Sequence, residues 1–206
     1  MIRRETAMND ERIGSKTIED VWNSLSPEAL DELRALGLRG PTWSQGMEMR
    51  GIAREPGSAL VPKRPIQAPN VLNEAYSYAK PSSFSRGMRV ELPGATMLLL
   101  SGTASVNENG KAAHLGDFRA QVLRTYRNLT ELLAAERATW HDVVRTTCYL
   151  RDIERDYAAF NEIRTLFFRE IGLESLPAST GIQAILCWPE LLVEMEAMAI
   201  LPKERV

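Results

Sequence analysis

The sequence lacks the features that mark several common classes of protein. Its formal net charge is -2 at pH 7 and charges of both signs are intermixed, so it has no basic stripe that could release counterions from a nucleic acid. It contains no apolar run of about 18 residues and no charged-then-apolar leader, the two patterns that predict a membrane span or an export signal. We therefore expect that it binds neither nucleic acid nor membrane.

Cysteine and histidine are scarce. The two cysteines, Cys148 and Cys187, lie in apolar, strand-like segments and form no CxxC pair, which favours buried reduced thiols and a cytoplasmic location. The two histidines, His114 and His141, are not spaced as metal ligands. No Gly-rich phosphate loop, HExxH or GxSxG motif occurs. These absences disfavour a metal site, a nucleotide-dependent enzyme and a serine hydrolase.

The first part of the chain, residues 1–69, is predicted to be an extension of the main domain. Ser26 can cap a helix, Pro27 suits its first position and leucines follow at helical spacing, so we expect a short helix over about residues 26–37. The stretch from there to residue 69 contains five prolines and no sustained periodicity, which predicts an extended arm.

The remainder, residues 70–206, shows clear periods and is predicted to form one domain. A chain with 44% hydrophobic residues can bury a core of ordinary size. The predicted elements are a strand at Met97–Leu100, a helix that opens near Asp117, a strand at Val143–Leu150, a helix over about Asp156–Glu170, and strands near Thr180–Cys187 and Leu192–Leu201. This order predicts an α+β fold with both helices on one face of a sheet, not a doubly wound fold.

The last predicted strand carries two carboxylates on one face. Alternation places Glu194 and Glu196 together, opposite the apolar Val193 and Met195. An unpaired buried carboxylate is costly, so one of the pair is a candidate acid or base; the spacing does not say which. The alternative is an exposed sheet face or an ion pair at a subunit interface.

Two short polar segments are further candidates. Ser101 and Gly102 are predicted to end the first strand, and Ser179 and Thr180 lie in the loop-like LPASTGIQA. Their hydroxyls and backbone N–H groups could bind an anion, although ordinary turns use the same residues.

Several segments resemble the Rid/YjgF proteins, also described as the L-PSP endoribonuclease-like superfamily. The segments are LLLSGTASVNENGK, GDFRAQVLRTYRNLTELLAA, VVRTTCYLRDIERDYAAFNEIRTLFF, LPAST and LLVEMEAMAI, in unbroken order from about Tyr78 to Pro202. The resemblance implies a chorismate-mutase-like α+β fold and a homotrimer with clefts for small-molecule metabolites between its subunits. It also implies hydrolysis of enamines and imines, such as 2-aminoacrylate, without a cofactor.

The resemblance also implies roles for individual residues. Glu194 matches a glutamate that positions a hydrolytic water, and Ser101, Gly102 and Asn161 match groups that line the ligand cleft. Phe84 stands where many relatives have tyrosine. With Ser179 and Thr180, these residues complete the predicted site.

One position departs from the family pattern. Deaminating relatives carry Pro-Ala-Arg, and the arginine clamps the substrate carboxylate, whereas Pro177 and Ala178 are followed here by Ser179. Deamination of ordinary substrates would then need another arginine in the cleft. The candidates are Arg86, Arg50, Arg54 and Arg64.

Three functions remain open from the sequence. The first is a small-molecule hydrolase, an enamine or imine deaminase whose substrate is altered by the loss of the arginine. The alternatives are a chorismatase-like hydrolase or lyase, because SGTAS, HLGD and PASTG resemble the C-terminal half of chorismatases, and a non-catalytic trimeric ligand-binding module. A ribonuclease is disfavoured by the charge balance.

Overall fold

The computed structural model divides into two units. It describes residues 12–13, 16–35, 60–78 and 82–203. The first unit comprises residues 1–60 and 79–83, and the second comprises residues 61–78 and 84–206.

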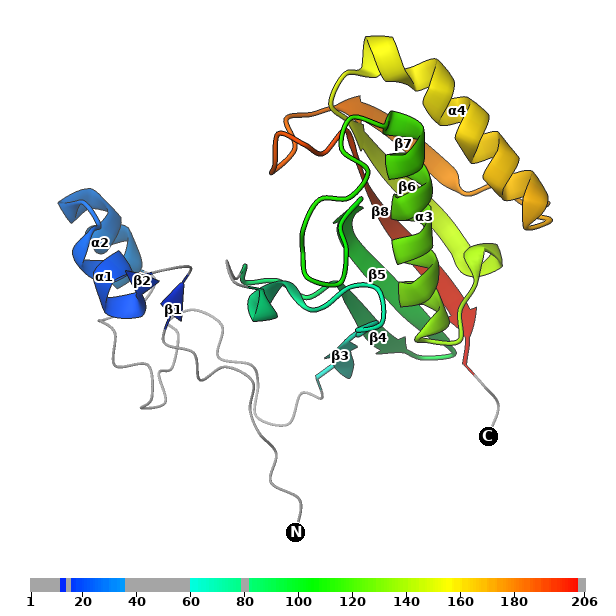
Figure 1. The fold of residues 1–206 in the computed structure, drawn as a ribbon. Helices are drawn as coiled ribbons and strands as arrows, with labels where there is room; N and C mark the ends of the chain where they lie inside the picture. The colour runs from blue at the N-terminus through cyan, green and yellow to red at the C-terminus, as the bar shows by residue number, and fades with distance from the viewer. Residues whose placement is uncertain (1–11, 14–15, 36–59, 79–81, 204–206) are drawn as a thin grey trace. The chain divides into compact units, whose positions relative to one another are not determined.

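The described part of the first unit is a short hairpin followed by two helices (Figure 1). The elements are β1 (Arg12–Ile13), β2 (Lys16–Thr17), α1 (Ile18–Asn23) and α2 (Pro27–Ala35). α2 is the helix predicted over residues 26–37, and the Oγ of Ser26 accepts a hydrogen bond from the backbone N–H of Ala29 at 3.2 Å, as an N-cap does. Residues 36–37 and the first part of the predicted arm lie outside the described residues.

The second unit is built on a six-stranded sheet. In spatial order its strands are β3 (Lys63–Pro65), β4 (Gly87–Leu92), β5 (Ala95–Ala104), β8 (Val193–Pro202), β6 (Val143–Leu150) and β7 (Ala178–Gln183). Neighbouring strands are antiparallel except β6 and β7. That pair is parallel because α4 (Ile153–Glu170) carries the chain back between its strands.

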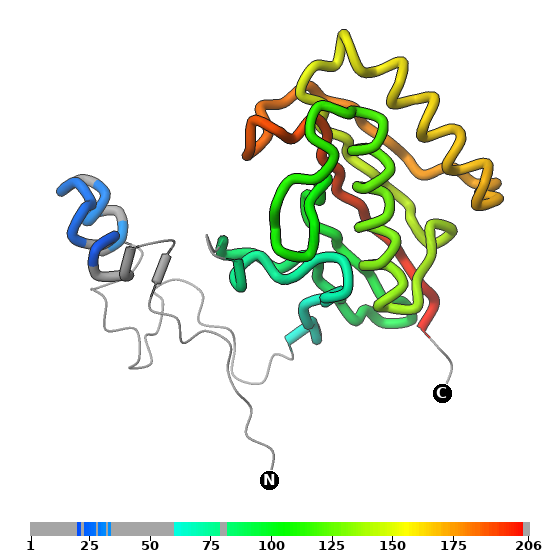
Figure 2. Tube along the Cα trace, viewed as in Figure 1, coloured from blue at the N-terminus to red at the C-terminus, as the bar shows by residue number. Residues whose placement is uncertain are grey.

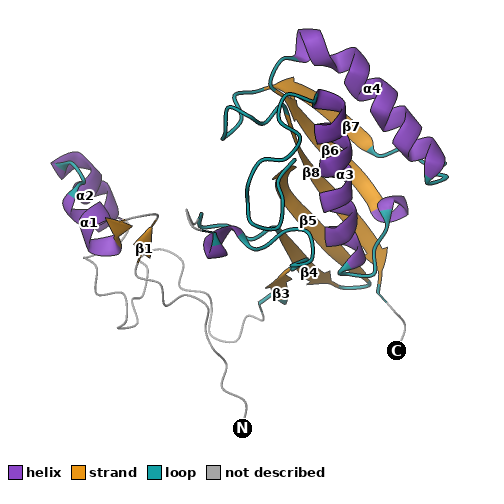
Figure 3. Ribbon diagram, in the orientation of Figure 1, coloured by secondary structure: helices purple, strands orange, loops and turns teal. Residues whose placement is uncertain are grey.

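Two long helices cover one face of this sheet, as Figures 1 and 3 show. α3 (Phe118–Ala134) connects β5 to β6, and α4 follows β6. β8 alternates accordingly: Val193 and Met195 are buried beneath the helices, whereas Glu194 and Glu196 lie on the other face. The predicted α+β fold with two helices on one face is confirmed, and the face opposite them is called the open face below.

Capping residues set where the helices begin. The carboxylate of Asp117 accepts a hydrogen bond from the N–H of Ala120 at 3.0 Å, so α3 begins where the sequence predicts. α4 begins three residues before the predicted Asp156, because Asp152 caps it through the N–H of Arg155 at 3.0 Å. β7, by contrast, ends at Gln183, before the predicted limit at Cys187.

Two strands of the sheet, β3 and β4, are absent from the predicted order. Residues 61–69, assigned from the sequence to the extension, belong to the second unit. β3 is held there by Arg64, whose two Nη atoms each donate to the buried carboxylate of Glu136 at 2.7 Å. The segment from residue 66 to residue 78 then lies beside the loop that follows β5 (Figure 2), where Asn73 Nδ2 donates to the backbone oxygen of Glu108 at 2.8 Å.

Candidate functional site

The predicted Ser101 and Gly102 lie within β5 and not beyond its end. Pairing with β8 shifts register between Leu100 and Thr103, so these two residues form a bulge. Ser101 Oγ donates to the backbone oxygen of Ser85 at 2.8 Å, which ties the bulge to the segment before β4. The strand therefore continues past the point where the sequence pattern stops, and the bulge redirects its backbone.

Glu194 occupies the space over Gly102. A Cβ added at Gly102 would lie 2.1 Å from Glu194 Oε1, far closer than atoms can approach, and 3.1 Å from Glu194 Cδ, which is a tight contact. The carboxyl group thus fits against the bulge only because residue 102 has no side chain. The structure brings together these two predicted residues from strands distant in sequence.

The surroundings of Glu194 change its protonation. Burial raises the pKa of its carboxyl group, the positive charge of Arg86 opposes this change, and the negative charge of Glu196 adds to it. A carboxyl group with a raised pKa exchanges protons closer to neutral pH than an ordinary one.

Arg86 lies on the same side of the sheet and is itself buried. Its guanidinium carbon is 5.1 Å from the centres of both the Tyr78 and the Phe84 rings, and its Nε donates to the backbone oxygen of Asn73 at 3.1 Å. The predicted Phe84 therefore contacts an arginine. Among the other proposed arginines, Arg64 pairs with Glu136, and Arg50 and Arg54 lie outside the described residues.

A second buried carboxyl group, that of Glu74, accompanies Arg86. Glu74 Oε2 accepts a hydrogen bond from the backbone N–H of Arg86 at 3.2 Å, and Oε1 has no partner among the described residues. Burial raises the pKa of Glu74, and the hydrogen bond and charge of Arg86 oppose this change. The sequence pattern did not indicate Glu74, because it lies outside any regular strand.

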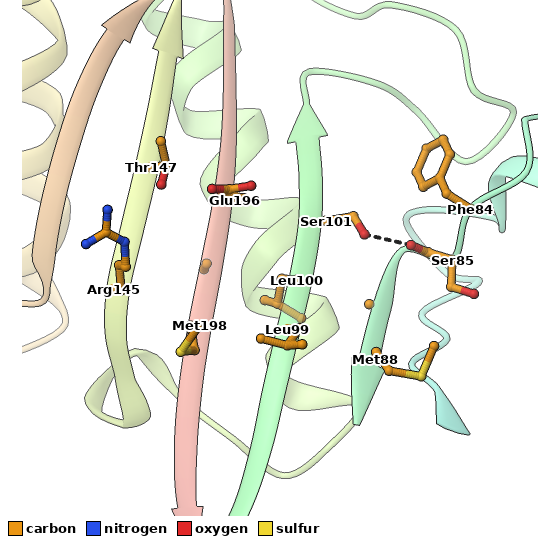
Figure 4. A pocket seen from close by; sticks show the side chains of 12 residues that line it. Phe84, Ser85, Met88, Leu99, Leu100, Ser101, Arg145, Thr147, Glu196 and Met198 are labelled. Atoms are coloured by element: carbon orange, nitrogen blue, oxygen red, sulfur yellow. Dashed lines mark hydrogen bonds between the residues drawn. The ribbon is translucent and has the colours of Figure 1, made fainter. Parts of the chain in front are cut away.

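Glu196 faces a different space from Glu194. A pocket of about 530 Å³ on the open face is lined by Phe84, Ser101, Arg145, Thr147 and Glu196, among others. Figure 4 shows Glu196 on β8 between Thr147 on β6 and Ser101 on β5. The two glutamates thus share a face, as predicted, but have different neighbours.

Tyr149 on β6 stands opposite Glu194 in the register and was not predicted. Burial raises the pKa of its hydroxyl, and interactions with Glu196 and Glu194 raise it further. The only sequence signal for Tyr149 was its place two positions after Thr147, which puts both side chains on the same face of the strand.

Asn161 and Ser179 form a separate group on the helix-covered side. Ser179 Oγ accepts hydrogen bonds from Thr146 Oγ1 at 3.1 Å and from Arg164 Nη1 at 3.3 Å, and Arg164 Nη2 also donates to Asn161 Oδ1. Thr180, the next residue, points to the open face, where Arg145 Nη2 donates to its hydroxyl at 3.3 Å. Arg164 was not among the arginines considered from the sequence.

Within one chain the predicted site residues therefore form two groups. Ser101, Gly102, Glu194 and Phe84 lie at the open face, whereas Asn161 and Ser179 lie between α4 and β7. Over the described ranges, no three His, Cys, Asp or Glu side chains are grouped as a metal site requires, and no helix has the length and apolar character to span a membrane.

Comparison with known proteins finds relatives for part of the chain. The chain is 34% identical over 84 residues to a RutC family protein of Pyrococcus abyssi, a match that spans 41% of this chain and 62% of that protein. It is 28% identical over 103 residues to the 3-aminoacrylate deaminase RutC of Acinetobacter baylyi, spanning 50% of this chain and 78% of that one.

A solved structure confirms the predicted chorismate-mutase-like fold. The YjgF gene product of E. coli superposes with a TM-score of 0.54 and 25% sequence identity, and the superposition covers 66% of this chain and 98% of that one. Residues 79–201 match the model of the family described as Endoribonuclease L-PSP. Because this match covers more than half of the 206 residues, the chain belongs to the Endoribonuclease L-PSP family, the Rid/YjgF superfamily that the sequence resembles.

Proposed function

We propose that this protein hydrolyses a small enamine or imine to a carbonyl compound and ammonia, without a metal or organic cofactor. Membership of the family supports a small-molecule deaminase-like or related role, and one relative is a 3-aminoacrylate deaminase. The observation that carries the proposal is the Glu194 carboxyl group, which is seated on the side-chain-free Gly102 and has a raised pKa.

Glu194 would act first as a base and then as an acid. As a carboxylate it orients a water molecule and takes its proton while the water oxygen bonds to the imine carbon. It then returns the proton to the nitrogen, which gives a carbinolamine. Next it takes the proton of the carbinolamine hydroxyl and passes it to the nitrogen, so that the carbon–oxygen double bond forms, the carbon–nitrogen bond breaks and ammonia leaves. An enamine first takes a proton at carbon and gives one up at nitrogen, which makes it the imine. A pKa raised by burial suits these transfers, because it makes the carboxylate a stronger base than an ordinary glutamate.

The ligand cleft would lie between subunits of a homotrimer. Leu99 pairs with Met198 and Met97 with Ile200 across β5 and β8, which makes an apolar patch on the open face, and Leu99 and Ile200 are exposed in the single chain. Burying this patch against other copies would remove apolar area from water. Assembly could also bring Glu194 of one subunit near Asn161 and Ser179 of the next, groups that one chain keeps apart.

The trimer is tested by light scattering. The native chain should have three times the monomer mass, and Leu99→Glu should lower this mass. Leu123→Glu, an equally exposed leucine on α3, is the matched control and should leave the mass unchanged. A native monomer would contradict the assembly.

Catalysis is tested by ammonia release from freshly generated 2-aminoacrylate and 3-aminoacrylate. We expect turnover by the native chain, loss of at least about a hundredfold in Glu194→Gln, and no loss in Glu131→Gln on the exposed side of α3. Glu196→Gln separates the two carboxylates, because a larger loss there would transfer the proposed role to Glu196. Absence of turnover with every substrate, combined with ligand binding, would favour a binding module, an alternative consistent with the serine at position 179.

A further inference from the structure

A second pocket lies between the end of α4 and the start of β7. Its volume is about 420 Å³, and none of its lining residues belongs to the pocket on the open face. Phe168, Leu173 and Pro177 supply apolar walls, and Arg164 and Ser179 contribute polar groups. A charge beside such walls interacts more strongly with a ligand than it would in water, because the apolar walls polarise less.

The guanidinium of Arg164 is held in a fixed position by three neutral neighbours. Nη1 donates to Ser179 Oγ at 3.3 Å, Nη2 donates to Asn161 Oδ1, and the guanidinium carbon lies 5.3 Å from the centre of the Phe160 ring. Asn161 is fixed in turn, because its Nδ2 donates to the backbone oxygen of Tyr157 at 3.0 Å. The arginine is thus oriented before any ligand arrives, which lowers the entropy lost on binding.

The positive charge in this pocket is incompletely balanced. Among residues 60–78 and 82–203, no carboxylate forms an ion pair with Arg164, unlike Arg64, Arg89, Arg119 and Arg155. A second cation, Arg169, lines the pocket, and Glu174 is the one carboxylate among its lining residues. A guanidinium carries five N–H donors, and Arg164 uses two of its groups on Ser179 and Asn161.

We propose that Arg164 binds the carboxylate group of a small ligand in this pocket. A guanidinium with unused donors matches a planar carboxylate in shape and charge, and the apolar walls suit the carbon part of an organic acid, which phosphate lacks. The inference rests on the proposed function and names a residue that would bind the carboxylate of its substrate. Arg164 contacts the hydroxyl of Ser179, so its cation lies beside the residue that replaces the family's arginine.

The test measures binding without turnover, by saturation-transfer NMR titration of pyruvate, observed through its methyl protons, with inorganic phosphate added as a competitor. The native chain should bind pyruvate more tightly than phosphate, and Arg164→Gln should weaken pyruvate binding about tenfold or more. Arg119→Gln removes the same charge from an exposed ion pair on α3 and should bind as the native chain does. If Arg164→Gln does not fold, Arg164→Lys takes its place, with an expected loss of several-fold because an ammonium cannot donate from two fixed Nη atoms.

The result separates this inference from the proposed function. Arg164-dependent pyruvate binding supports the site even if no enamine is turned over. Equal pyruvate affinity in the native chain and in Arg164→Gln overturns the site, even if ammonia release is intact. Tighter phosphate than pyruvate binding overturns the assignment to carboxylates.

Discussion

Replacing Gly102 by alanine tests the site at its most crowded point. The new Cβ would lie 2.1 Å from Glu194 Oε1, whereas ordinary van der Waals contact begins at 3.4 Å. The carboxylate oxygen must therefore recede by the difference, 3.4 minus 2.1, or about 1.3 Å. Glu194 Cδ, at 3.1 Å from the added atom, is crowded as well, so the whole carboxyl group moves.

The expected consequence falls on catalysis more than on stability. A misplacement of about 1 Å at a reacting group can cost about a hundredfold in rate, or about 2.7 kcal/mol. The backbone of Gly102 is not in the left-handed region, so alanine meets no backbone strain there, and its effect on unfolding should be within about 1 kcal/mol. The crowding around the new Cβ is relieved by movement of the Glu194 side chain, and the backbone of the sheet need not move.

The assay compares kcat for ammonia release and the thermal unfolding midpoint in Gly102→Ala and Gly181→Ala. Gly181 is the matched control, since a Cβ there would have its nearest neighbour, Tyr157 Cε2, at 3.6 Å. We expect kcat to fall about a hundredfold in the first variant only, with both proteins folded. A native kcat in Gly102→Ala would contradict this reasoning, because it would show that the reaction does not depend on the position of the Glu194 carboxyl group.

Three further outcomes follow from burial and charge. Since burial raises the pKa of Glu194, the folded chain binds more protons than the unfolded chain between the two pKa values, and stability falls as pH rises through that window. Glu194→Gln should flatten this fall in thermal unfolding as pH rises from the ordinary pKa of 4.5, and an unchanged slope would contradict the raised pKa. Glu136→Ala removes the buried partner of Arg64, which is 58% exposed, and of Arg89, which keeps its pair with Glu91, so it should cost about 1 to 2 kcal/mol in urea unfolding. An unchanged free energy of unfolding would mean that water already screens these ion pairs. Cys187 is exposed, although the sequence favoured a buried thiol, and should react with a thiol reagent in the native protein. Cys148 is buried and has a raised pKa, so it should react only after unfolding; rapid reaction of both thiols in the native protein would contradict the burial of Cys148.

The parts of the fold that the sequence predicted are those with a single strong period. α3 and β6 have apolar faces and capping or β-branched residues that point to one structure, and both appear within the expected limits. β4 was missed although Met88 and Val90 alternate with the charged Arg89 and Glu91, because two charged residues on one face of a strand suggest a surface loop. Those charges are satisfied by tertiary partners: Arg89 pairs with Glu91 at 2.6 Å and with Glu136 at 3.2 Å, contacts that no local pattern shows.

The site shows a similar limit. That Glu194 and Glu196 share a face follows from alternation alone, but their different surroundings depend on the register with β5, in which Glu194 stands opposite Ala104 and Glu196 lies at the bulge. The bulge at Ser101 and Gly102 arises from the register of two strands far apart in sequence, so the sequence predicted a strand end in its place. Arg164 was overlooked for the same reason: on the helix it reads as a surface charge, and only the crossover to β7 brings Ser179 beside it.

The positions of the ionisable groups are better explained by ligand binding than by stability. Glu194 and Glu74 are carboxyl groups whose pKa is raised chiefly by burial, so each one destabilises the folded state at neutral pH. Arg164 is oriented by neutral partners, although a carboxylate partner would stabilise it more. A protein under selection for stability alone would gain by replacing the acids with amides and by pairing the arginine. Under the proposed function, acid and cation lie on opposite sides of one sheet and must meet at a single substrate through a second copy of the chain. Leu99→Glu should then lower the mass of the oligomer and abolish ammonia release together.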